Sequence, residues 1–218
     1  MIEIFSELVE LIYRGASEET PWLSFADKLR LTLEAQVVAI TLHHSREEMG
    51  DVYVMSHIPS DRTDWTTVER IYRDEFMRND PHRPSVMMPG ELVVSETASQ
   101  VSTIRPFLRS LGITHSLRAC CAEPDGMRCW IDATWDVDAK AGTPFTPPNL
   151  NLMHKLLPHL DGALKLYAMM KQREAEKAIY ASVVDHFALG FVLINERVQP
   201  IHINHIHASI LEEWPNIA

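Results

Sequence analysis

The stretch LRACCAEPDGMRCWIDATW at residues 117–135 constrains the fold of this chain most strongly. Two β-rich runs flank a Pro-Asp-Gly turn, and a three-residue loop that ends in glycine is typical of a β-hairpin with a bulge. In that register Cys121 lies opposite Cys129. The same register sets Arg118 opposite Asp132 on the other face, so that charge meets countercharge. A slip of one residue would mix both faces, so the sequence predicts this antiparallel pair.

Helical and strand patterns alternate along the rest of the chain. In order, we expect helices at 1–14 and 21–35, strands at 36–44 and 51–58, helices at 63–80 and 101–113, the hairpin, and a long helical region within 143–187. Runs of strands separated by pairs of helices are typical of an α+β fold in which helices flank an antiparallel sheet.

Apolar residues within the long helical region alternate spacings of four and three. They are Met153, Leu157, Leu160, Leu164 and Tyr167. Such a heptad-like seam packs either on the sheet of the same chain or against a second chain, and the sequence leaves both alternatives open. Beyond residue 170 the seam meets charged side chains, so we expect a solvated connector there.

The segment HINHIHASILEEW at 202–214 places three histidines within six positions. It follows two short strands, 190–194 and 198–203, and Asn204 has the side chain of a helix N-cap. His205 and His207 then point about 200° apart around a helix, so they cannot chelate one ion together. We therefore expect no metal here, and interpret the segment as the strand–turn–strand–Asn–helix opening of a second module.

The chain has 218 residues, of which 46% are hydrophobic, and this is enough to build a buried core. Its formal net charge of −10 disfavours contact with a phosphate backbone, so the chain as given is a poor nucleic-acid binder. No apolar run approaches the length of a membrane span, and the N-terminal helix pattern contains acidic residues, unlike a signal peptide. We expect a cytoplasmic protein with no membrane contact.

An aromatic stripe indicates a candidate ligand site. Trp65, Tyr72 and Phe76 fall on one face of a helix, and a nearby strand could turn its side chains toward them. The complete set of expected ligand-binding residues is Tyr53, Met55, Trp65, Tyr72, Phe76, Asp80, Cys129 and Ile131. An apolar enclosure with a few polar groups is what a small-molecule site requires. The alternative is that the stripe belongs to an ordinary core and that Asp80 caps a turn.

Several short motifs occur in the order found in one family. These are RNDPH (78–82), PGELV (89–93), PFTPPNLNLMHKLLPHLDGALKLY (144–167) and the strand–turn–strand–Asn–helix segment. Together they resemble bacterial LuxR-type transcriptional regulators that have a GAF-like sensor, a PAS-like segment and a C-terminal helix-turn-helix. The resemblance implies a GAF-like sensor domain at 1–148, a long helix that closes it at 149–182, and a partial PAS-like module at 183–218. The DNA-binding helices would lie outside this chain.

A looser similarity links Trp65, Tyr72, Phe76 and the pair Asp80-Pro81 to the quorum-sensing autoinducer receptors. In those receptors an aromatic-rich helix ends in Asp-Pro and lines a pocket for an acyl-homoserine lactone. Tyr72 lies one residue off the receptor pattern. The similarity implies a pocket for a small molecule on this helix.

The sequence is compatible with three functions. The first is a ligand-sensing and dimerisation region that relays a small apolar or aromatic signal through the long helix to a helix-turn-helix. The second is a ligand-free dimerisation scaffold, and the third is a thiol redox sensor that uses Cys121 and Cys129. We do not expect an enzyme or a cofactor, because the sequence has no nucleophile elbow, phosphate loop or metal-ligand spacing. His154 and His159 lie about 140° apart on a helix and do not converge.

Overall fold

The computed structural model describes residues 2–43, 52–76, 88–97, 104–122, 127–136, 146–185 and 192–203, together with residues 206 and 209. These residues form two compact units, Met1–Ala168 and Met169–Ala218. The boundary between the units falls inside the predicted helical connector at 149–182.

The first unit combines helices with one five-stranded sheet. Its helices are α1 (Ile2–Gly15), α2 (Leu23–Leu33), α3 (Trp65–Ile71), the π-helical turn η2 (Tyr72–Phe76), α4 (Arg105–Ser110) and the first part of α5 (Pro147–Asp185). Its strands are β1 (Val37–His43), β2 (Val52–His57), β3 (Leu92–Glu96), β4 (His115–Ala122) and β5 (Arg128–Trp135). The strand order is β2-β1-β5-β4-β3, and every neighbouring pair is antiparallel. The predicted α+β fold with a helix-flanked antiparallel sheet is therefore confirmed.

The hairpin at the centre of this sheet has the predicted register. Cys121 pairs with Cys129, and Arg118 pairs with Asp132. The Pro-Asp-Gly loop lies outside the described residues. The sequence prediction missed β3, an edge strand that pairs with β4 and follows the turn around Gly90.

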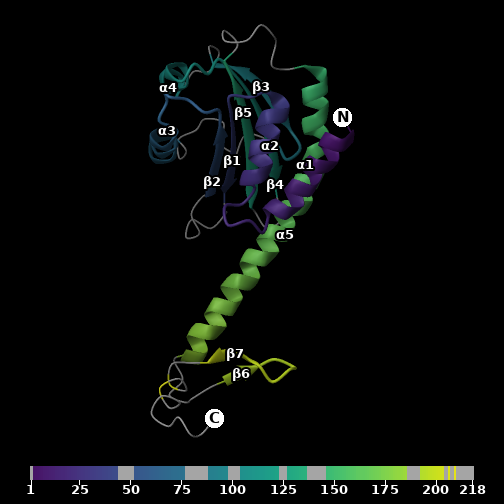
Figure 1. Ribbon diagram of the computed structural model, residues 1–218, viewed down its shortest axis with the longest axis vertical. Helices are drawn as coiled ribbons and strands as arrows, with labels where there is room; N and C mark the ends of the chain where they lie inside the picture. Colours follow the sequence, from purple (N-terminus) through teal and green to yellow (C-terminus); the bar gives the residue numbers. More distant parts are fainter. Residues whose placement is uncertain are drawn as a thin grey trace. The chain divides into compact units, whose positions relative to one another are not determined.

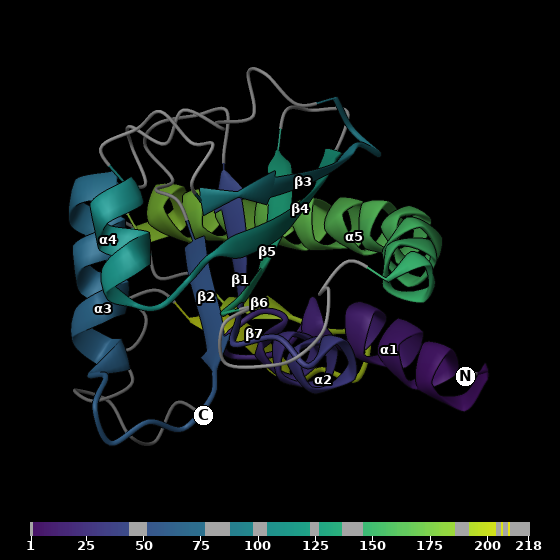
Figure 2. The same cartoon turned by 90° about the horizontal axis from the view of Figure 1, so that it is seen from above.

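Helices cover both faces of the sheet, and Figure 2 shows α3 and α4 on one side with α1 and α2 on the other. The main hydrophobic core lies on the side of α1, α2 and α5, and it includes alternate residues of β5: Cys129, Ile131, Ala133 and Trp135. Because successive side chains of a strand point to opposite faces, Asp132 and Thr134 face α3 and α4 instead.

The seam of α5 packs into this core. Met153, Leu157, Leu160, Leu164 and Tyr167 are all at most 5% exposed. The ring of Tyr167 lies 5.1 Å from that of Trp22, and α1 runs beside α5, with Tyr13 and Phe5 packed on His159 (Figure 1). The structure thus places the seam in its own unit, the intramolecular alternative.

The second unit contains the end of α5 and a small hairpin. Its two strands are β6 (Val192–Ile194) and β7 (Pro200–Ile203), close to the predicted 190–194 and 198–203. The Asn195 side-chain carbonyl organises the loop by accepting hydrogen bonds from the backbone N–H groups of Arg197 and Gln199, both at 2.9 Å. Asn204, His205 and His207 lie outside the described residues.

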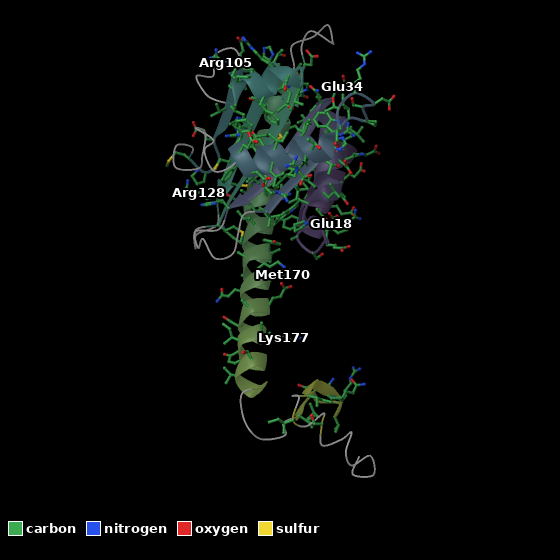
Figure 3. The ribbon with its side chains drawn as sticks, turned by 90° about the vertical axis from the view of Figure 1, so that its left-hand side faces the viewer. Glu18, Glu34, Arg105, Arg128, Met170 and Lys177 are labelled. Carbon is green, nitrogen blue, oxygen red and sulfur yellow. The ribbon has the colours of Figure 1, made fainter. Side chains whose placement is uncertain are left out.

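The α5 segment of this unit is exposed to solvent, as predicted for a connector. Residues 172–180 are all exposed, and Figure 3 shows Met170 and Lys177 standing out from the helix. None of the helices in the described part of the chain has an apolar stretch long enough to cross a membrane.

Candidate ligand-binding cavity

A cavity of about 250 Å³ lies against the face of the sheet that looks away from the main core. The floor comes from all five strands. Its side chains are Val37, Ala39, Tyr53, Met55, Val93, Ser95, Ser116, Arg118, Asp132 and Thr134. Strand pairing explains this set, because Met55, Ala39, Asp132, Arg118 and Val93 form one continuous row across the five strands.

The helical walls of the cavity are apolar, and Glu91, just before β3, adds one exposed charged residue to the lining. The wall residues are Trp65, Val68 and Tyr72 from α3 and η2, and Ile104, Phe107, Leu108, Leu111 and Ile113 from α4 and its flanks. Asp64 positions α3, since its carboxylate caps the helix by accepting hydrogen bonds from the N–H of Thr67 at 3.3 Å and from its hydroxyl at 2.7 Å. A polar floor under apolar walls gives the site one hydrogen-bonding side and one apolar side.

Aromatic contacts fix the helical wall to the sheet. The Trp65 indole stacks on His57 of β2 at a centroid distance of 4.9 Å and an angle of 18°. The Tyr72 ring lies 5.0 Å from that of Tyr53, also on β2. These contacts attach α3 and η2 to the edge of the sheet at β2, because each ring packs on a residue of that strand.

A partly buried ion pair crosses the floor. Arg118 donates to Asp132 through Nε at 2.5 Å and through Nη2 at 3.0 Å, and each of the two side chains is 13% exposed. This bidentate geometry is the strong form of an arginine–carboxylate contact. Beside it, the hydroxyls of Ser95 and Ser116 hydrogen-bond each other at 2.8 Å.

Tyr53 stays a neutral phenol. Burial raises its pKa well above the usual range, and the negative charge of Asp132 raises the pKa further. The group therefore presents an O–H, and not a phenolate, at any physiological pH.

Two buried polar atoms of the lining have no hydrogen-bond partner among the described residues. One is Nε1 of Trp65, whose side chain is almost fully buried, and the other is Oγ1 of Thr134. Buried donors and acceptors are nearly always satisfied in native proteins. The indole N–H is thus a donor ready for an acceptor atom of a bound molecule.

The predicted ligand residues fall into four groups, of which Cys129 and Ile131 form the last. Tyr53, Met55, Trp65 and Tyr72 lie together in the cavity lining. Phe76 is outside the lining, but its ring packs at 5.0 Å on Phe107, which is part of it. Asp80 lies outside the described residues.

Cys129 and Ile131 do not line the cavity, contrary to the expectation from sequence. Both belong to the main core on the opposite face of the sheet. The reason is the period of two along β5, which turns Asp132 toward the cavity and its neighbour Ile131 away from it. The pairing of Arg118 with Asp132 follows from the sequence, and the polar face of the hairpin that carries them was the available signal for the site.

The thiols are buried and free. Cys121 and Cys129 lie in the main core, and a hydrogen bond to Cys129 together with burial raises the pKa of Cys121 well above its usual range. Burial also raises the pKa of Cys120, to about 11. None of this favours a reactive thiolate at neutral pH. Within the residues that the structure describes, no group of three His, Cys, Asp or Glu side chains is arranged to hold a metal ion.

Similar proteins were found only by comparison of structures. No protein-family model and no curated protein matches the sequence. Several solved structures, in contrast, match the fold of this chain. One is CepR2 of Burkholderia cenocepacia, an N-acylhomoserine lactone dependent LuxR family transcription factor, with a TM-score of 0.55 and 13% identity over 79% of this chain and 98% of that chain. The chain shares its fold.

Two GAF proteins show the same architecture. The GAF domain/HD domain protein of Geobacter sulfurreducens matches with a TM-score of 0.51 and 11% identity over 78% of this chain and 99% of that chain. The phycoerythrobilin-bound GAF domain of a cyanobacterial phytochrome matches with a TM-score of 0.50 and 12% identity over 78% and 97%. At such low sequence identity these matches establish only a GAF-like fold, which CepR2 also has. They give no information about the ligand.

Proposed function

We propose that this chain is the ligand-sensing region of a bacterial transcriptional regulator, and that the cavity under α3 and α4 binds its small-molecule signal. The observation that carries the proposal is the unpartnered indole N–H of Trp65 inside an otherwise apolar wall. An unpaired buried donor costs about 1–3 kcal/mol, and a ligand oxygen would remove that cost. The fold shared with CepR2 supports the same role.

The route of the signal is part of the proposal. α5 closes the sensor core with Leu164 and Tyr167 and continues to Asp185. A ligand that favours one arrangement of the sheet face would bias the packing of this helix. In the proposed protein the helix leads through the PAS-like hairpin to a helix-turn-helix that contacts DNA. We also propose a cytoplasmic homodimer without catalytic activity.

Variants of Trp65 and Tyr72 test the proposal. Ligand at a hundred times its dissociation constant stabilises the folded state by about 2.7 kcal/mol, which raises Tm by about 5–10 °C for a domain of this size. We expect a panel of small uncharged compounds to contain molecules with this effect on the wild-type protein. Trp65→Phe keeps the ring and removes the N–H, so it should reduce the affinity about tenfold or more.

A structural role of the aromatic wall would give another result. Tyr72→Ala should abolish the ligand-dependent rise in Tm while the variant still folds. If both variants unfold easily and no compound shifts the Tm of the wild-type protein, the aromatic residues are simply core and the sensor proposal is wrong.

A further inference from the structure

A groove lies on the other side of the sheet, where the first turns of α1 and α5 meet. Its volume is about 290 Å³, and Figure 1 shows the N-terminal end of α1 beside the start of α5. The lining comes from α1, α2 and α5, all within the first unit. Its residues are Ile2, Ile4, Phe5, Thr32, Pro148, Asn149, Asn151, Leu152 and Lys155. We call this site the α1–α5 groove.

Apolar side chains form most of the α1–α5 groove. Phe5 and Leu152 are partly buried and pack against the main core, whereas Ile2 and Ile4 are 83% and 41% exposed. Apolar side chains that gather at one place on the surface are typical of a ligand or partner site. A protein–protein interface has about 20–30 residues on each side, whereas nine residues line this groove, so its size suits a small molecule.

The charge of the α1–α5 groove is positive, although the chain as a whole has a formal net charge of −10. Among the described lining residues Lys155 alone is charged. Its side chain is exposed, and within the described part of the chain it forms no ion pair. Glu7, one turn after Ile4 on α1, is paired with Lys28 of α2, with Oε2 2.6 Å from Nζ. The groove therefore joins an apolar surface to one available cation.

We infer that the α1–α5 groove is a second ligand site, separate from the cavity under α3 and α4, and that it binds an amphipathic carboxylate. The acyl chain lies against Ile4, Phe5 and Leu152, and the carboxylate lies beside Lys155. Asn151 is four residues before Lys155 and so on the same face of α5, where its amide can donate to the same carboxylate. The volume is roughly twice the 150 Å³ that holds benzene, so an acyl chain of about eight carbons fits.

Octanoate and octanamide test this inference because they share one chain and differ in charge at neutral pH. Titration into the isotope-labelled 218-residue chain, followed by two-dimensional NMR at low ionic strength, gives the affinity and the place of binding together. We expect octanoate to shift the amide signals of Phe5 and Leu152. It should bind there about threefold to fivefold tighter than octanamide, the range for an exposed ion pair. At about 1 M salt, screening should remove most of that preference.

Three variants separate the charge from the apolar contact, and each changes an exposed side chain. Lys155→Met keeps an apolar stem and removes the charge, so the preference for octanoate should disappear while the affinity for octanamide is retained. Lys165→Met makes the same change of net charge on α5 outside the groove and should keep the preference. Ile4→Ser should weaken both probes alike, by about threefold or more, because it removes apolar contact.

The inference is overturned if neither probe shifts the signals of the groove, if both bind there equally, or if Lys155→Met keeps the preference for octanoate. A wild-type dimer that dissociates in Ile4→Ser, with no shift of groove signals by either probe, would show that a second copy of the chain covers this surface instead. None of these results decides the role of the cavity under α3 and α4, because signals such as that of the Trp65 indole report on it separately.

Discussion

Leu164→Ala should destabilise the sensor unit strongly. Leu164 is 1% exposed and lies in the core that α5 shares with α1, α2 and the sheet. The substitution removes three carbon atoms, and at about 0.8 kcal/mol for each the lost burial is about 2.4 kcal/mol. The unfilled space adds about 1 kcal/mol or more, so we expect the free energy of unfolding to fall by about 3–4 kcal/mol.

Urea denaturation followed by circular dichroism measures this loss, and Leu166→Ala is the matched control. Leu166 lies two residues away on the same helix but is 48% exposed, so its substitution should cost less than about 1 kcal/mol. If Leu164→Ala costs less than 1 kcal/mol, or no more than Leu166→Ala, the seam does not pack as described.

Three further predictions concern other parts of the first unit. Burial raises the pKa of Cys120 to about 11, so iodoacetamide should alkylate this thiol at pH 8 at least 100-fold more slowly in the folded than in the unfolded protein. Mass spectrometry of the modified peptide measures both rates, and equal rates would contradict the prediction. Hydrogen bonds from Thr67 lower the pKa of Asp64, so the stabilising effect of this cap is present above the usual carboxyl range and is lost as the pH falls. After correction for the intrinsic pH dependence of exchange, the protection factors of the α3 amides should fall at acid pH, and Asp64→Ala should remove that fall; an unchanged pH profile of protection in the variant would mean that another group is responsible. Gly15→Ala should lower the free energy of unfolding by about 1–3 kcal/mol, because a Cβ would lie 2.7 Å from Cδ1 of Trp22; a neutral effect in thermal unfolding would show that the indole can move aside.

The register of the hairpin could be predicted from sequence, because one face has apolar residues and the other has charged residues. The opposed charges of Arg118 and Asp132 and the opposed thiols of Cys121 and Cys129 agree on one register. β3 could not be predicted in the same way, because its five residues have no comparable pattern and it depends on pairing with β4.

The side of the sheet on which a cavity forms could not be predicted. Alternation in β5 separates Ile131 from Asp132, but it does not reveal which face is filled by helices and which is left partly open. The main core fills the face of Ile131, because α1, α2 and α5 pack there.

The aromatic helix was only partly predictable for a geometric reason. Spacings of seven and four place Trp65, Tyr72 and Phe76 on one face of a regular α-helix. In the structure the helix changes to a π-helical turn at Tyr72, and the wider turn rotates the following residues. Tyr72 remains in the cavity lining, whereas Phe76 reaches Phe107 instead.

Native mass spectrometry tests most directly whether the cavity binds a small molecule. The wild-type protein and Trp65→Ala would each be incubated with a small-molecule extract of bacterial cells and then measured under gentle and denaturing conditions. Our account predicts a reproducible extra mass of an uncharged compound on the wild-type protein, lost on denaturation and absent from the variant. The bare mass of the wild-type chain under gentle conditions, or the same added mass on the variant, would contradict it.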